Sequence, residues 1–589
     1  MLRQIFFSIF FFSQLLFAQS SYIDYVSPFH PVEGKKGMVV SQNRDSSEIG
    51  IEILNMGGNA IDAAVAVGFS LSITLPRAGH LGGGGFMLIR IKDEQEIIAI
   101  DFRSRASENA DLEKIFDFKL PEEYEFIDRD RVRYGYQASA VPGTVAGLLK
   151  AHELYGKLPL KKIMEPVLRQ AKNGIVVSFD LHHAINSTPQ LLNDRESKKI
   201  YFSGDSPVPI NSKLVLDDLH QTLKLIAQKG KAGFYEGITA KRIASAMKQN
   251  NGFITSNDLK KYEAKVSKPI STKYRDKIIF THGPPSGGGI ALLSALNVIE
   301  NYDFKIGDSE TFNTMHVLAE AIKYGHQMRS KHVGDPDFES IPVDNLIDKN
   351  ASKAFYNQIN FSSKLANIEY QGPNIPESRD TTHFSIIDAD GNAVSNTYTL
   401  GYSFGSGVTI PGTGILMNNQ MNNFALLAGS SIVSREASTA NRFNPGKKPM
   451  STMAPVIVTN LSGDIFMITG SPGGSFIPSS ILRVINGVID FDLDIGRATM
   501  LTRINKDWPN DKFEYEATLN ADVKRALSKL HTNLIDSKTM GSTQSIIIEN
   551  GIKYGFAVLR RPNAGVAIQN LLLLFIYWIA FSILCNDSS

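Results

Sequence analysis

Cysteine is almost absent from this chain of 589 residues, since the only one is Cys585, near the C-terminus. An internal disulfide is therefore excluded, and so is a lipoprotein anchor on an N-terminal cysteine. If the mature protein is exported, its hydrophobic core alone must keep it folded.

The chain also lacks an excess of charge of one sign, because 61 basic and 59 acidic residues leave a formal net charge of +2. The basic residues are scattered, so we expect no nucleic-acid partner. No Pro/Gly/Ser-rich linker, charge block or internal repeat divides the chain, although its length would suffice for roughly two or three domains.

The histidines are dispersed and predict no metal site. The glycine run at 82–85 lacks a phosphate-binding pattern and indicates close backbone packing instead.

The two ends of the chain are apolar. Residues 1–20 contain Arg3, an apolar run and a small-x-small site ending at Ser20, which predict a secretory signal peptide; an uncleaved anchor is the alternative. We therefore expect export to the periplasm or the extracellular space. The apolar stretch at 571–584 is short for a membrane span of about 20 residues. A tilted or interfacial membrane anchor and a read-through gene end both explain this tail, taken as 568–589.

Between the ends, helical and strand patterns alternate. Asn59 is a helix-capping residue, and the preceding Gly57-Gly58 is a helix stop. The alternation favours a layered α/β arrangement over a barrel or a bundle. The spacing predicts helices over 46–56, 61–71, 145–154 and 311–328, and strands over 97–102 and 544–548.

The most informative segment is Asp380-Thr381-Thr382-His383. Cleavage before Thr381 would give an N-terminal threonine, whose hydroxyl is a nucleophile and whose α-amine has a reference pKa of roughly 7.7 to 8.0. Such an amine can accept the hydroxyl proton without help from a histidine. The pattern alone is also compatible with an ordinary strand.

A hairpin follows this segment. Residues 382–387 and 393–400 are rich in strand-forming residues, and the turn-rich sequence between them centres on Asp390. A five-residue loop pairs positions that mirror about Asp390, so Thr381 faces Thr399. We expect the hydroxyl of Thr399 to bind the nucleophile, although a plain cross-strand threonine pair has the same geometry.

These residues resemble the start of the small subunit of the gamma-glutamyltransferases. The resemblance covers residues 37 to about 567, and its motifs keep one order along the chain. Besides Thr381-Thr382-His383, Asp390-Gly391-Asn392-Ala393-Val394 and Thr397-Tyr398-Thr399, they are Gly37-Met38-Val39-Val40-Ser41, Gly57-Gly58-Asn59-Ala60-Ile61-Asp62-Ala63-Ala64, the glycine-rich 82–86, Asp101-Phe102-Arg103, Val141-Pro142-Gly143-Thr144-Val145-Ala146-Gly147, His316-Val317-Leu318-Ala319-Glu320-Ala321, Asn418-Asn419-Gln420-Met421, Gly470-Ser471-Pro472-Gly473-Gly474-Ser475 and Met540-Gly541-Ser542-Thr543-Gln544-Ser545.

The resemblance implies a fold of the α/β (α+β) class, the four-layer αββα sandwich of the N-terminal-nucleophile hydrolases. It implies self-cleavage between Asp380 and Thr381 into a large subunit, 21–380, and a small catalytic subunit, 381–567, that form one domain. It also implies transfer of a γ-glutamyl group from a donor, with glutathione expected, to water, amino acids or peptides. No cofactor is expected.

Site roles follow from the same resemblance. Arg103 matches the arginine that binds the donor carboxylate, for which its planar fork is suited. Ser451 and Thr452 match paired hydroxyls that contact the same carboxylate, and Gln420 is retained beside them. Gly473 and Gly474 can aim two backbone N–H groups at an oxyanion.

The chain departs from the family where the donor's α-ammonium would bind. Asn422 and Asn423 stand where two acidic residues are usual, and Gly401 replaces an asparagine. An acylase of the same fold that hydrolyses glutaryl-type amides, which lack the amine, is therefore the alternative function. A hypothesis of another class is an inactive, membrane-tethered binding protein. The segment 425–448, with Glu436, resembles the lid over the site.

Overall fold

The computed structural model of the uncut chain describes residues 27–570, except 95, 117–128, 364–379, 426–438, 509–510, 532 and 538. The expected signal peptide, the apolar stretch at 571–584 and most of the expected lid, including Glu436, lie outside the described residues. Among the helices that are described, none combines the length and the hydropathy that a membrane crossing needs.

Two seven-stranded sheets form the centre of the molecule. The first, the β16 sheet, contains in spatial order β1 (Val32–Gly34), β22 (Ile552–Ala557), β21 (Gln544–Glu549), β17 (Ile465–Thr469), β16 (Val456–Asn460), β11 (Lys277–Thr281) and β10 (Ile270–Tyr274). The second, the β12 sheet, contains β23 (Gly565–Ile568), β2 (Met38–Ser41), β12 (Thr382–Ile387), β13 (Ala393–Thr399), β3 (Gly84–Arg90), β4 (Ile97–Phe102) and β9 (Lys265–Ser267).

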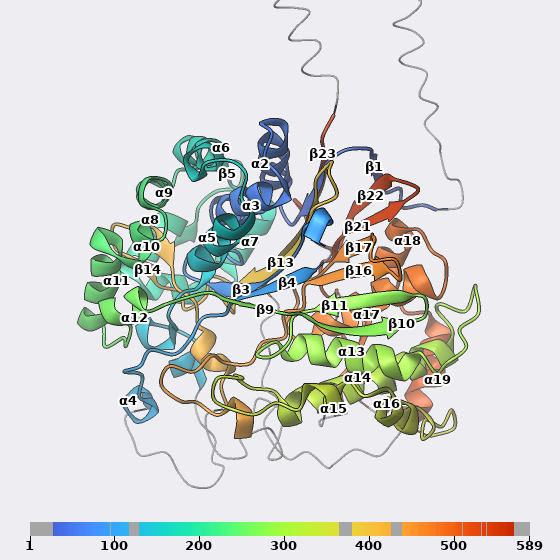
Figure 1. Cartoon of the computed structure of the whole chain (residues 1–589). Helices are drawn as coiled ribbons and strands as arrows, with labels where there is room; N and C mark the ends of the chain where they lie inside the picture. The colour runs from blue at the N-terminus through green and yellow to red at the C-terminus, as the bar shows by residue number, and fades with distance from the viewer. Residues whose placement is uncertain are drawn as a thin grey trace, which may run out of the picture.

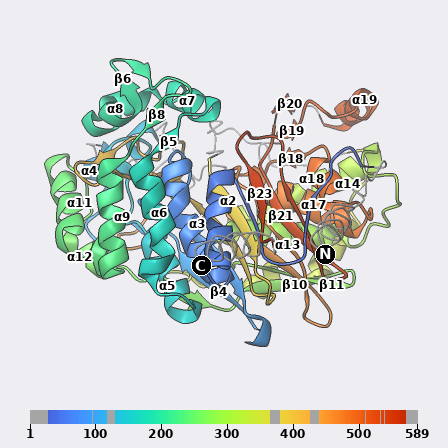
Figure 2. The ribbon, with the colours of Figure 1, turned by 90° about the horizontal axis from the view of Figure 1, so that it is seen from above.

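Three apolar clusters separate four layers. One packs α2 (Arg44–Asn55), α3 (Ala60–Thr74) and α5 (Thr144–Tyr155) on the outer face of the β12 sheet. Another packs α13 (Gly287–Ile299), α14 (Phe312–His332) and α17 (Phe476–Ile489) on the outer face of the β16 sheet. Between the sheets, Val40 and Leu88 meet Ile457 and Ile546. Figures 1 and 2 show the sheets between these two groups of helices, which confirms the αββα sandwich.

Smaller elements surround this sandwich. The helices are α4 (Leu112–Phe116), α6 (Leu160–Asn173), α7 (Phe179–Asn186), α8 (Arg195–Tyr201), α9 (Asp217–Lys229), α10 (Ala232–Tyr235), α11 (Gly237–Gln249), α12 (Ser256–Lys260), α15 (Val343–Leu346), α16 (Lys349–Tyr356), α18 (Ile495–Met500) and α19 (Ala521–Leu530). The strands are β5 (Ile175–Val176), β6 (Phe202–Ser203), β7 (Ser206–Pro207), β8 (Lys213–Leu214), β14 (Thr409–Ile410), β15 (Ile415–Leu416), β18 (Ile504–Lys506), β19 (Phe513–Tyr515) and β20 (Leu534–Asp536).

The predicted helices and strands are present, with ends shifted by a few residues at most except where α3 and α14 run further. Asn59 caps α3 as expected: its side chain accepts from the N–H groups of Ile61 and Asp62, while Asp62 accepts from the N–H of Asn59. The glycine run serves close packing, because a Cβ at Gly82 would lie 1.9 Å from the carbonyl oxygen of Leu416. A residue with a side chain would therefore not fit at Gly82, just before β3.

Asp62 should be the polar residue of α3 whose loss destabilises the fold most. It is fully buried, and besides the N–H of Asn59 it accepts from the N–H groups of Lys157 and Leu158, at 3.0 to 3.2 Å. Asp62→Ala removes the buried charged acceptor that these three N–H groups share, which should cost about 2–4 kcal/mol of unfolding free energy. Urea denaturation would measure it. Asp522→Ala is the control, since Asp522 also lies in a first helical turn but is exposed.

Candidate active site

The hairpin of β12 and β13 lies inside the β12 sheet, between β2 and β3. Its register pairs Thr382 with Tyr398 and His383 with Thr397, so the mirror arrangement about Asp390 is confirmed. Continued by one residue, the same register sets Thr381 opposite Thr399. Both threonines are largely buried, with exposed fractions of 6% and 5%.

The hydroxyl of Thr399 is engaged with the bond that precedes Thr381. Its Oγ1 donates to the carbonyl oxygen of Asp380 at 2.8 Å and accepts from the N–H of Gly401 at 2.8 Å. Because a hydroxyl has one proton, in this uncut chain the proton of Thr399 points to that carbonyl and not to the Thr381 hydroxyl. The structure therefore brings Thr381 and Thr399 together as predicted, but the Thr399 hydroxyl binds the Asp380 carbonyl instead of the Thr381 hydroxyl.

His383 lies on the same face of β12 as Thr381, two residues away, but it is not available as a base. Its ring nitrogens contact Oγ1 of Thr397 at 2.8 Å and Oγ of Ser385 at 3.0 Å. Burial lowers the pKa of His383 to about 3, because the charged imidazolium would lose its hydration. The imidazole stays neutral near pH 7, so a base for Thr381 has to come from elsewhere.

Arg103 and the Ser451-Thr452 pair lie together. The guanidinium of Arg103 donates from Nε to the carbonyl oxygen of Pro449 at 3.2 Å and from Nη2 to that of Met450 at 3.3 Å, directly before Ser451. Its exposed fraction is 1%. Burial lowers the pKa of Arg103 to about 9, opposed by the charge of Asp101, so the side chain remains a cation near neutral pH. Such a buried cation is suited to bind a carboxylate.

Arg103 and Thr381 lie at the same end of the β12 sheet. The end of β13 at Thr399 pairs with the start of β3 at Gly84, and the neighbouring Gly85 pairs with Phe102 at the end of β4. Thr381 and Arg103 are thus three strands apart, or about 14 Å between backbones at the usual strand spacing. A donor with a carboxylate at one end can span this gap once side-chain length is included.

The polar residues at 420–423 lie between the Thr399 end of the hairpin and the segment that binds Arg103. Nε2 of Gln420 donates to the carbonyl oxygen of Thr399 at 2.8 Å. Asn441 joins Asn423 to the Arg103 segment, because its Nδ2 donates to the Asn423 carbonyl and its Oδ1 accepts from the N–H of Met450, both at 2.8 Å. Hydrogen bonds therefore connect the segment of Gln420 and Asn423 to the hairpin on one side and to the Arg103 segment on the other.

The glycine pair lies at the corresponding end of the β16 sheet. Thr469, the last residue of β17, pairs with Val456 at the start of β16, shortly after Thr452. Gly473 and Gly474 have φ angles of 136° and 59°, in the region that favours glycine. Within the part of the chain that the structure describes, neither N–H of the pair has an acceptor. Two backbone donors are thus free for a ligand oxygen.

Sequence reasoning missed the side-chain partners of Asp380. Its carboxylate forms an ion pair with Arg77, and Nη1 of Arg561 lies 3.4 Å from Oδ1. Burial acts to lower the pKa of Arg77, but Asp380 and Asp180 raise it overall. Burial, and after it the Arg77 charge, lower the pKa of Arg561. Arg77 and Arg561 are 303 and 181 positions from Asp380, and no pattern in the sequence predicts contacts between residues so far apart.

The dispersed histidines do converge at one place. His316, Glu320 and His531 are buried, and their potential ligand atoms lie within 4.8 Å of one another. The Lys506 ammonium is 2.6 Å from Nδ1 of His531 and 3.5 Å from Oε1 of Glu320, and Lys323 pairs with the same carboxylate at 2.9 Å. These two cations already compensate the acid, which disfavours a divalent metal.

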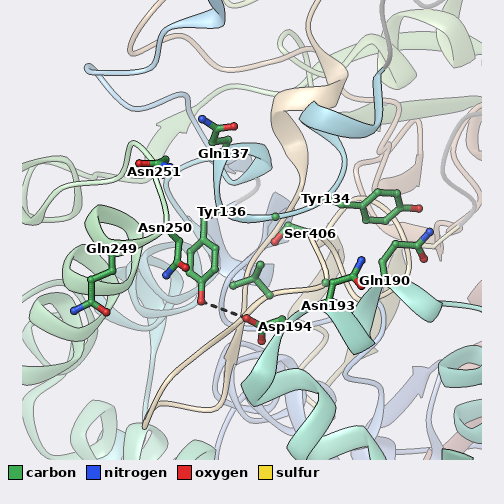
Figure 3. A pocket seen from close by; sticks show the side chains of 13 residues that line it. Tyr134, Tyr136, Gln137, Gln190, Asn193, Asp194, Gln249, Asn250, Asn251 and Ser406 are labelled. Atoms are coloured by element: carbon green, nitrogen blue, oxygen red, sulfur yellow. Dashed lines mark hydrogen bonds between the residues drawn. The ribbon is translucent and has the colours of Figure 1, made fainter. Parts of the chain in front are cut away.

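Two cavities lie away from the hairpin. One, of about 570 Å³, is lined by tyrosine, serine and amide side chains, and in it the hydroxyl of Tyr136 donates to Asp194 at 3.3 Å (Figure 3). The other, of about 810 Å³, borders residues 251–256. Neither is lined by Thr381, Arg103 or the glycine pair, so neither is the candidate acyl site.

Known proteins resemble this chain in sequence and in fold. A family model described as gamma-glutamyltranspeptidase matches residues 46–568. A glutathione hydrolase proenzyme of Escherichia coli is 38% identical over 90% of this chain and 91% of its own length. An acylase ACY 1 proenzyme of a Pseudomonas species is 32% identical over 93% and 96%. The crystal structure of a cephalosporin acylase from Bacillus halodurans superposes with a TM-score of 0.81 at 25% identity, covering 94% of this chain and 99% of that one.

The depressed pKa of His383 predicts acid sensitivity. The unfolded histidine binds a proton near pH 6.5 and the folded one near pH 3, so this contribution to stability is complete above about pH 6.5 and is lost as the pH falls toward 3. His383→Gln should lessen the dependence of unfolding free energy on pH in this window by up to about 1.4 kcal/mol per pH unit. Urea titrations at several pH values would test this. An unchanged slope would contradict a neutral buried imidazole.

Proposed function

This chain belongs to the gamma-glutamyltranspeptidase family, and we propose that it is a self-cleaving enzyme that transfers γ-glutamyl groups through Thr381. The observation that carries the proposal is the contact at the hairpin end, where Thr399 donates to the Asp380 carbonyl beside Thr381. A hydrogen bond to a carbonyl oxygen makes its carbon more electrophilic. The bond next to the nucleophile is therefore the activated one.

Maturation would proceed as an N-to-O acyl shift. Oγ of Thr381 attacks the Asp380 carbonyl carbon, the C–N bond breaks, and the hydroxyl proton of Thr381 is transferred to the departing nitrogen. Water then hydrolyses the ester, which leaves a carboxylate on Asp380 and a free α-amine on Thr381. The amine gained in this step is the base that the neutral His383 cannot supply.

Turnover would use the same hydroxyl. The donor carboxylate binds Arg103, with Ser451 and Thr452 beside it, while the scissile amide lies at Thr381. The Thr381 amine takes the hydroxyl proton, Oγ attacks the γ-carbonyl carbon, and the N–H groups of Gly473 and Gly474 stabilise the oxyanion. The leaving amine departs with the proton. Water or an acceptor amine then attacks the ester and releases the acyl group.

The proposed donor is glutathione or a related γ-glutamyl amide, and the acceptor is water, an amino acid or a peptide. Residues 21–380 and 381–567 would form the two subunits. The proposal includes export, which the signal-like sequence at 1–20 supports, and membrane association would depend on the tail at 568–589.

A glutaryl-type acylase is the second candidate, because Asn422 and Asn423 replace the acids that would hold an α-ammonium. The 32% identity to an acylase proenzyme supports it. An inactive binding protein is the third reading. The retained Thr381, Thr399 and glycine pair oppose it, whereas a gel that shows one uncut chain would favour it.

Cleavage at the proposed bond can be tested by N-terminal sequencing. We expect a small fragment that begins at Thr381 and a large one that begins at Ser21. Thr381→Ala should remain one inactive chain, since both the nucleophile of the shift and that of turnover are lost. A small fragment with any other start would contradict the mechanism.

Donor selectivity tests the Asn423 departure. Asn423→Asp should raise the preference for a γ-glutamyl anilide over the glutaryl anilide by about tenfold, because a charged acceptor binds the ammonium more strongly than a neutral one. Arg103→Ala is the control: it should weaken both donors together, since both have the distal carboxylate. An unchanged ratio in Asn423→Asp would mean that the amine is recognised elsewhere, with Glu436 the next candidate.

A further inference from the structure

The residue before the proposed cut, Asp380, is held by charge from two distant parts of the chain. Arg77 Nη1 donates to Oδ1 of Asp380, and Nη1 of Arg561 lies 3.4 Å from the same oxygen. The side-chain exposed fractions are 5% for Arg77 and 20% for Asp380, so water competes little for this contact. Charge-assisted pairs in such surroundings are strong and directional.

Arg77 is itself immobilised. Its Nε and Nη2 donate to the two carboxylate oxygens of Asp180, at 3.1 and 3.4 Å, from the first turn of α7. Its backbone carbonyl accepts from the N–H of Phe404 at 2.9 Å, and the next carbonyl, of Ala78, accepts from Leu400 at 3.1 Å. Arg77 is thus fixed to the segment that follows Thr399.

The backbone of Asp380 is fixed independently of its side chain. Thr399 binds its carbonyl oxygen at 2.8 Å and is held in turn by the N–H of Gly401. The two attachments, one on the carboxylate and one on the carbonyl, leave little freedom for the carbonyl carbon. A reacting carbon held in this way meets a neighbouring nucleophile far more often than one on a free chain.

We propose that Arg77 and Arg561 are positioning residues for chain cleavage, which hold Asp380 so that its carbonyl carbon faces Oγ of Thr381. This inference rests on the proposed self-cleavage and goes beyond it, because it assigns a role to two arginines that no substrate needs to touch. We call the contacts of Arg77 and Arg561 with Asp380 the clamp. Asp180 supports the clamp because it holds the guanidinium of Arg77. Oγ–C bond formation and C–N bond breakage proceed as described above, with neither arginine exchanging a proton.

A purely structural ion pair is the competing explanation, since the same contacts connect α7, the 77–79 segment and the C-terminal region. The two explanations differ in what each variant changes. A structural pair affects unfolding, whereas a positioning pair affects the rate of cleavage in a chain that is still folded. Rate and stability must therefore be measured separately.

The experiment follows the appearance of the small fragment from the full chain, by gel densitometry after synthesis in a cell-free system. Arg77→Gln and Asp380→Asn should each slow cleavage by about tenfold or more. The double variant should be no slower than Asp380→Asn alone, because that single change already weakens the contact with Arg77. Arg77→Lys should restore part of the rate. Arg169→Gln is the control, since Arg169 forms an exposed pair with Glu52.

Thermal unfolding of the same variants in the uncleavable Thr381→Ala background provides the stability readout. Midpoints close to that of the parent, together with slowed cleavage, would support the clamp. Unchanged cleavage rates, or slowing that parallels a fall in the midpoint, would overturn it. If the unmodified chain were itself uncut at Thr381, the proposed function and the clamp would fall together, whereas normal cleavage of the variants would remove the clamp alone.

Discussion

The register of the β12–β13 hairpin is the constraint on which the rest of the site depends. A slip of one residue would reverse the side chains of the strand and separate Thr381 from Thr399. The register is fixed on both sides, because β2 pairs with β12 and β3 with β13. Both strands of the hairpin are buried along their whole length. The position of two hydroxyl groups is thus set by the packing of an entire sheet.

Burial also determines the chemistry available at that end of the sheet. The Thr399 hydroxyl and the neutral imidazole of His383 lie near Thr381, and charged groups at this end of the sheet are paired, Arg77 with Asp380 and Lys448 with Asp101. Desolvation makes a buried charge costly unless it is paired, and it strengthens each hydrogen bond that remains. The arrangement suits a nucleophile whose base is created by cleavage, since no permanent base has to be kept ionised beside it.

Local patterns predicted the fold well. Alternating apolar residues and turn signals located the hairpin, and Asn59 with Asp62 marked the start of α3. Motif resemblance located Arg103, Ser451 and the glycine pair, which the structure brings to one end of the two sheets. What the sequence could not supply were contacts between single residues far apart in the chain. The Arg77–Asp380–Arg561 contacts and the His316–Glu320–His531 cluster depend on tertiary packing, for which neither spacing nor composition carries a signal.

The order of strands has a consequence if the chain is cut before Thr381, as proposed. In the β12 sheet, β2, β3, β4 and β9 precede residue 381 and β12, β13 and β23 follow it, and in the β16 sheet β1, β10 and β11 precede it. The two pieces from such a cut would share both sheets, and hydrogen bonds and a common core would hold them together. Once unfolded, however, they must find each other as separate molecules, so reassembly becomes dependent on concentration. A protein cut in this way would fold as a single chain only before the cut. Afterwards the lifetime of its folded state would be set by its rate of unfolding and not by a reversible folding equilibrium.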